Sequence, residues 1–123
     1  MRKHPLTFST VRKIALEFPG VEDGTAYGSP ALKVRGQLLA CIPIHRSAEP
    51  HSLAVRVDMT DRAHLLAEAP DTYYVTDHYV PHPAVLVRLS RINVDSLRDL
   101  LAMAHKFVTA KKTAATKRTR RRR

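Results

Sequence analysis

The hydrophobic residues of this chain repeat at two spacings, one typical of helices and one typical of strands. The first helical repeat starts near Thr7 and stops at Pro19-Gly20, which end a helix. Its apolar members are Val11, Ile14, Ala15 and Phe18. The last repeat follows Asn93, a candidate helix cap. Its stripe is made of Leu97, Leu100, Leu101, Ala104, Phe107 and Val108. These repeats predict a helix near each end of the chain.

Between the two helices the apolar residues alternate with polar ones, as in strands that bury one face. Leu32 and Val34 face one way, while Ala31, Lys33 and Arg35 face the other, and Gly36 closes a hairpin turn. A short helix, capped by Thr60 or Asp61, is predicted over residues 60–69. Strands are predicted over residues 25–27, 31–35, 37–44, 52–57, 73–76 and 84–89, with turns at residues 28–30 and 78–83.

Helices at both ends and between strands joined by hairpin-length links predict an α+β fold. Its sheet should be mainly antiparallel and covered by helices on one face. We expect a loose leader over residues 1–6, one domain over residues 7–109, and a basic C-terminal tail over residues 110–123. A chain of 123 residues suits one such domain.

Positive charge is concentrated in the tail. The formal net charge is +10, from 21 Lys and Arg residues against 11 acidic ones. Eight of those cations lie in residues 111–123, without an acid among them. They are Lys111, Lys112, Lys117, Arg118, Arg120, Arg121, Arg122 and Arg123. Such a segment buries no apolar surface and repels itself, so we expect a disordered arm that binds nucleic acid.

Four further cations fall at outward positions of the predicted strands. They are Lys33, Arg35, Arg56 and Arg88. If the strands pair in ordinary register, these side chains share one face and form a platform for phosphates. The alternative is a solvated face with local ion pairs to Asp58 or Asp77. Tyr27, Tyr73, Tyr74 and Tyr79 offer stacking surface for bases, or else they pack the rim of the sheet.

Other classes of protein are disfavoured by the sequence. The first residues contain no apolar run typical of a secretory signal, and no stretch approaches a membrane span. The lone Cys41 cannot form an internal disulfide and is expected to be a buried small residue. No phosphate-binding glycine loop occurs among the four glycines. The expected location is the cytoplasm, or the nucleoid of a bacterial cell.

The histidines carry no recognisable metal motif. His78 and His82 are four residues apart in a segment not expected to be helical, a spacing that does not bring both rings to one face. We therefore expect no metal and no cofactor. Asp77, His78 and Tyr79 form the one plausible acid–base cluster, but no nucleophile or paired carboxylate stands beside it. No catalytic residue is assigned.

Four stretches resemble the MmcQ/YjbR-like family: GTAYGSPALKVRG, LAVRVDMTDRAHLL, TYYVTDHY and AVLVRL. Together they lie within residues 8–108. The resemblance implies an α/β sandwich likened to frataxin-like and secretion-chaperone-like folds, with hairpin wings, and it implies DNA binding. Many members carry a tryptophan where this chain has Pro83-Ala84-Val85, so a stacking role at that point is not carried over.

The leading hypothesis is a non-enzymatic protein that binds nucleic acid, with DNA favoured, through the tail and a weakly basic sheet face. A protein-interaction module is the first alternative, which the chaperone-like fold suggests. An enzyme with a site near Asp77 and His78 is the second. The sequence predicts no membrane partner.

Overall fold

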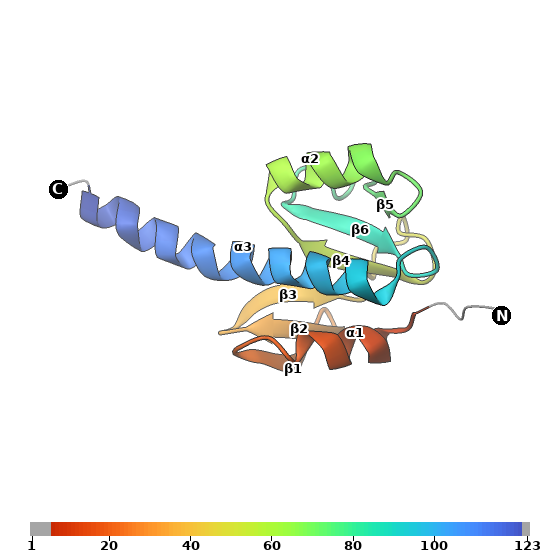
Figure 1. Cartoon of the computed structure of the whole chain (residues 1–123), viewed down its shortest axis with the longest axis horizontal. Coiled ribbons are helices and arrows are strands. Elements are labelled where there is room, and N and C mark those ends of the chain that lie inside the picture. The colour runs from red at the N-terminus through yellow and green to blue at the C-terminus, as the bar shows by residue number, and fades with distance from the viewer. Residues whose placement is uncertain (1–5, 122–123) are drawn as a thin grey trace.

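A computed structural model describes the backbone of residues 6–121 and the side chains of residues 6–110. Within that range the chain forms three helices and six strands (Figure 1). In chain order they are α1 (Phe8–Ala15), β1 (Val21–Ala26), β2 (Ser29–Val34), β3 (Gln37–Cys41), β4 (Ser52–Arg56), α2 (Met59–Glu68), β5 (Tyr73–Tyr74), β6 (Ala84–Arg88) and α3 (Val94–Arg121).

The six strands form one antiparallel sheet in the order β1-β2-β3-β4-β6-β5. Two tight turns connect the first three strands of this sheet. Tyr27-Gly28 joins β1 to β2 and Arg35-Gly36 joins β2 to β3, and all four residues have positive φ. Two consecutive positive φ values are the signature of the hairpin turn that matches strand twist. The predicted α+β fold with its antiparallel sheet is confirmed.

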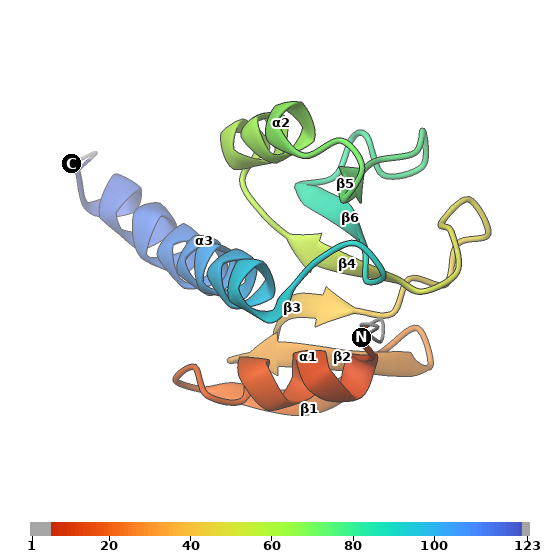
Figure 2. The ribbon, with the colours of Figure 1, turned by 45° about the vertical axis from the view of Figure 1, so that its right-hand side comes forward.

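One face of the sheet is covered by the helices (Figure 2). Burial of apolar side chains there follows the period of each element, because strands contribute alternate residues and helices contribute a stripe. From α3, Leu97, Leu101 and Ala104 are fully buried, as the helical repeat predicts. The strands add Leu32, Leu53, Val55, Val85 and Val87. This packing is the main source of stability.

The opposite face is open and carries small side chains at its centre. Ala31, Cys41, Ala54 and Leu86 are buried together on neighbouring strands. Because large residues fill the helix side and mostly small ones remain on the other, the open face is hollowed at its middle. Cys41 is 7 % exposed, so the prediction of a buried small residue is confirmed.

Several predicted boundaries were wrong. β1 begins at Val21 rather than at residue 25, and the turn lies at Tyr27-Gly28 rather than at residues 28–30. The cap of α2 is Asp58, whose carboxylate accepts the backbone N–H of Thr60 at 2.7 Å. By contrast, the predicted cap of α3 is confirmed: Asn93 Oδ1 accepts the N–H of Ser96 at 2.8 Å.

The long helix α3 runs past the edge of the sheet (Figure 1). Val108 is the last buried core residue among its described side chains. The tail predicted to be disordered, residues 110–123, overlaps the C-terminal part of this helix. Its side chains beyond residue 110 lie outside the described residues. Of the predicted leader only Leu6 is described, and it packs against the core. None of the described helices has the length and apolar character needed to cross a membrane.

Candidate functional site

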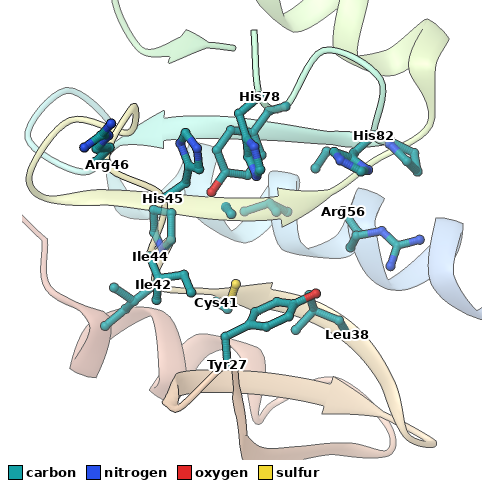
Figure 3. A pocket seen from close by; sticks show the side chains of 16 residues that line it. Tyr27, Leu38, Cys41, Ile42, Ile44, His45, Arg46, Arg56, His78 and His82 are labelled. Atoms are coloured by element: carbon teal, nitrogen blue, oxygen red, sulfur yellow. The ribbon is translucent and has the colours of Figure 1, made fainter. Parts of the chain in front are cut away.

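A pocket of about 880 Å³ lies on the open face of the sheet (Figure 3). Its floor contains Cys41 and Ala54, whose small side chains leave the hollow. Tyr27 and Leu38, from the hairpin side, form one wall. His78 and His82, from the β5–β6 loop, form the other. The sheet and one loop therefore build a concave site on the face that the helices leave uncovered.

The loop that carries these histidines is held by one arginine of α2. Arg62 Nη1 donates to the carbonyl oxygens of Tyr79, His82 and Ala84 at 3.3, 2.9 and 3.2 Å, and Nη2 donates to Val80 O at 3.0 Å. The planar guanidinium presents several donors in a fixed fork, which suits this set of carbonyls. Arg62 thereby fixes the wall of the pocket from outside it.

Replacing Arg62 by methionine should loosen this loop. Arg62→Met keeps an unbranched apolar stem and good helix propensity but removes every donor, so we expect a loss of about 1–3 kcal/mol in the free energy of unfolding. Amide exchange at Val80 and His82 should accelerate more than exchange in the core strands. Arg91→Met, at an exposed residue, is the control. Equal behaviour of the two variants would show that Arg62 does not hold the loop.

Three histidines meet at the pocket, which the sequence prediction missed. The rings of His45 and His78 stack with centroids 3.7 Å apart and planes 9° apart, and His82 lies with its centroid 6.0 Å from that of His78. The expectation that the four-residue spacing does not bring the rings of His78 and His82 to one face was wrong, because both rings line the pocket. The loop bends back on itself, and the N–H of His82 donates to Tyr79 O at 3.0 Å.

The protonation of this cluster follows from its contacts. Nδ1 of His45 accepts the N–H of Ser47 at 3.1 Å, so in its neutral form this ring carries its proton on Nε2. Desolvation lowers the pKa of His78, and the neighbouring His45 and His82 lower it further. Burial raises the pKa of the Tyr79 phenol and that of the Cys41 thiol. The charged form of His78 is therefore disfavoured, and Tyr79 and Cys41 hold their protons more tightly than usual.

Metal and acid–base chemistry find limited support here. Within residues 6–110, no three His, Cys, Asp or Glu side chains are arranged to hold a metal ion. Asp77 is exposed and makes no hydrogen bond with His78 among the described residues. The absence of a metal and of a catalytic residue stays a prediction.

The predicted strand cations separate into two groups. Lys33 lies over the open face of the sheet. Gly24 on β1 pairs with Ala31, which faces that side, and a Cβ built on Gly24 would be 3.4 Å from Lys33 Cδ. Arg35 was expected on a strand but lies in the β2–β3 turn, with φ 52°. Arg56 ends β4 on the same side of the sheet. These three residues are called here the cationic end. The elements that carry them, which are the end of β2, the β2–β3 turn and the end of β4, lie on the side toward which α3 extends (Figure 1).

Arg56 makes no ion pair with a carboxylate among the described residues. Its Nε is buried and makes no hydrogen bond there. The guanidinium carbon lies 6.0 Å from the centroid of the Phe107 ring, at the outer limit of a cation–π contact. Arg56 also lines the pocket, so it belongs both to the pocket and to the cationic end.

Arg88 belongs elsewhere. It faces Ser52 across the β4–β6 pair while Arg56 faces Ala84, so the two arginines lie at opposite ends of these strands, about 13 Å apart along them. Arg88 binds both carboxylate oxygens of Glu49 at 2.9 Å, and its guanidinium carbon lies 4.4 Å from the Tyr74 ring centroid. Arg88 therefore shares the open face with the other three cations, as expected, but it lies at the opposite end of the strands and is paired with Glu49, and a phosphate contact by Arg88 stays a prediction.

The tyrosines are likewise divided. Tyr73 is buried in the core, and the hydroxyl of Tyr74 is bonded to Ser52 Oγ at 2.5 Å and to the N–H of Glu49 at 2.7 Å. Tyr27 is 82 % exposed at its turn. Only Tyr27 and Tyr79 therefore offer ring surface to a ligand of the pocket, among the four predicted.

Comparisons with known proteins agree with this architecture. The YjbR family model matches residues 16–107. A crystal structure of Deinococcus radiodurans protein DR2400, with the family-model domain DUF419, superposes with a TM-score of 0.71 at 20 % identity. The superposition covers 91 % of this chain and 85 % of that one. At this identity the likeness concerns the fold alone.

Two curated relatives are similar over a short stretch. They are the uncharacterized proteins Mb2600 of Mycobacterium bovis and Rv2570 of Mycobacterium tuberculosis. Each is 45 % identical to this chain over 40 residues, which span 32 % of this chain and 31 % of the relative. The match thus covers about a third of their length.

Proposed function

This chain belongs to the YjbR family, and from that premise we propose that it is a non-catalytic cytoplasmic protein that binds nucleic acid, with DNA favoured, through its cationic end and its basic tail. Phosphate contacts by Lys and Arg supply most of the affinity of sequence-independent binding. The proposal therefore needs unpaired cations placed side by side on the surface.

The placement of the cationic end carries the proposal. Lys33, Arg35 and Arg56 make no ion pair among the described residues, and they lie on the side where α3 leaves the sheet. The sequence of that helix continues into the eight cations of residues 111–123. A duplex that meets the tail would thus also meet the end of the sheet. Glu22 lies opposite Lys33 in the β1–β2 register, and its negative charge moderates the positive charge of this region.

A test follows from the separation of the cations. Lys33→Ala combined with Arg35→Ala should weaken duplex binding about tenfold and lower the salt slope by up to about 2, because each phosphate contact contributes roughly 0.9 to that slope. The measurement is fluorescence anisotropy with a labelled duplex at several salt concentrations.

Arg88→Ala is the matched control. Glu49 already neutralises Arg88, and this pair lies at the opposite end of the strands. Its removal should leave the salt slope unchanged within error. If Arg88→Ala weakens binding as much as the double variant does, or if the double variant binds like wild type, the cationic end is not the phosphate-contacting surface.

A further inference from the structure

We propose that the pocket on the open face binds a small phosphorylated ligand that carries a planar ring, of the size and chemistry of a nucleoside monophosphate. The volume of about 880 Å³ falls within the range of roughly 300–1,000 Å³ that is typical of small-molecule sites. This proposal does not depend on duplex binding by the cationic end.

The charge of the lining favours an anion. Its titratable side chains include Arg46 and Arg56, and neither Asp nor Glu occurs among the described residues that line it. Figure 3 shows the two arginines at opposite ends of the pocket, with His78 between them. Arg56 has its Nε buried without a hydrogen-bond partner in the described part of the chain. Guanidinium groups bind phosphate oxygens with two parallel donors. Because Nε is buried, the Nη groups of Arg56, which make no hydrogen bond to the described residues, are the donors offered to a phosphate-sized anion.

The shape of the lining favours a ring. Tyr27 presents its ring at one wall, and the stacked His45 and His78 with the edge-on Tyr79 form the other. The floor of Cys41 and Ala54 is apolar. Planar rings stack on such side chains without needing a particular pattern of hydrogen bonds. A ligand with a base at the tyrosine wall and a phosphate near an arginine satisfies both parts of the lining.

The pocket is also held open before any ligand arrives. Arg62 fixes the histidine loop from outside, and Ser47 Oγ bonds Thr76 Oγ1 at 2.8 Å, which ties the β3–β4 loop to the same wall. Preformed sites lose less conformational entropy on binding. The site therefore requires no large rearrangement.

Isothermal titration of the full chain with adenosine 5′-monophosphate tests the proposal, with adenosine and inorganic phosphate as comparison probes. The monophosphate should bind, and adenosine should bind at least about tenfold more weakly, since a charge-assisted contact to phosphate is lost. His78→Ala and Arg56→Gln should each weaken binding about tenfold. The matched controls His64→Ala and Arg91→Gln, at exposed residues outside the pocket, should bind like wild type.

A second arm separates a free nucleotide from the end of a strand. A short single-stranded oligonucleotide with a 5′-phosphate is compared with the same oligonucleotide ending in a 5′-hydroxyl. Binding of the free monophosphate assigns the site to a metabolite, and a phosphate-dependent gain that His78→Ala removes assigns it to a terminal nucleotide. Either result supports the phosphorylated ligand. The proposal is overturned if adenosine binds as well as its monophosphate, if His78→Ala and Arg56→Gln bind like wild type, or if no probe binds.

The affinity should also depend on pH in a defined direction. The pKa of His78 is lowered in the free protein, and a bound phosphate stabilises its charged form, so binding should tighten as pH falls through the interval between these two pKa values. The ligand phosphate itself titrates near pH 6 in every variant, so the informative quantity is the difference between wild type and His78→Ala. Identical pH profiles would contradict a contact between His78 and the phosphate. The other titratable or charged groups that line the pocket are Tyr27, Cys41, His45, Arg46, Arg56, Tyr79 and His82.

Discussion

Removal of residues 111–123 is expected to lower the affinity for duplex DNA about a hundredfold or more at low salt. If all eight cations of this segment meet phosphates, their contribution to the slope of log K against log salt approaches about −7, from roughly −0.9 per contact. Most of this slope should disappear with the segment. The loss should be similar for unrelated duplex sequences, because phosphate contacts carry no base information.

The truncated chain should remain folded, which makes the comparison fair. Val108 is the last core residue among the described side chains of α3, and the sequence of residues 111–123 contains no large apolar residue, so the melting temperature should hardly change. A large drop in melting temperature would show that residues 111–123 contribute to the folded domain. An unchanged salt slope would show that the segment does not bind phosphates.

Leu101→Ala is expected to cost about 2–5 kcal/mol in the free energy of unfolding. Leu101 is 0 % exposed in the middle of α3 and packs in the core that joins the helices to the sheet. Truncation leaves a cavity that a close-packed interior fills only in part. Denaturant unfolding measures the change. Leu16→Ala, at a residue 38 % exposed after α1, should cost less than about 1 kcal/mol. Similar costs for both variants would show that Leu101 is not a central core residue.

The elements with strong local signals were predictable from the sequence. The stripe of α3 identified its buried face, and Asn93 identified its start. The alternation of Leu32 and Val34 identified the face of β2 that the helices cover. Each of these features depends on residues within a few positions of one another, where periodicity and capping chemistry act directly.

Other local sequence features were compatible with two different local structures. Ser29-Pro30 resembles a turn, yet both residues belong to β2, and the carbonyl of Pro30 accepts the N–H of Ile42 at 3.2 Å. The actual turn places Tyr27 at φ 55°, a conformation that tyrosine seldom adopts. Asp58 was considered as an ion-pair partner of the sheet cations, although an aspartate just before a helix is also a strong cap. In each case the competing interpretation was chemically sound.

The pocket could not be predicted because it depends on contacts between distant residues. His45 and His78 are 33 positions apart and meet only because β3, β4 and β6 are neighbours in the sheet. Arg62 reaches carbonyl groups 17 to 22 positions further along the chain, and carbonyls leave no signal in a sequence. The motif resemblance contained both segments, MTDRAHLL and TYYVTDHY, without indicating that one holds the other.

The most direct test of the proposed function is an anisotropy titration of the full chain with two duplexes of unrelated sequence, at low salt and at increasing salt. We expect both duplexes to bind with similar affinity at low salt, and both affinities to fall along the same steep, linear slope on a double-logarithmic plot. Absence of binding to either duplex at low salt would contradict the proposal that this chain binds nucleic acid.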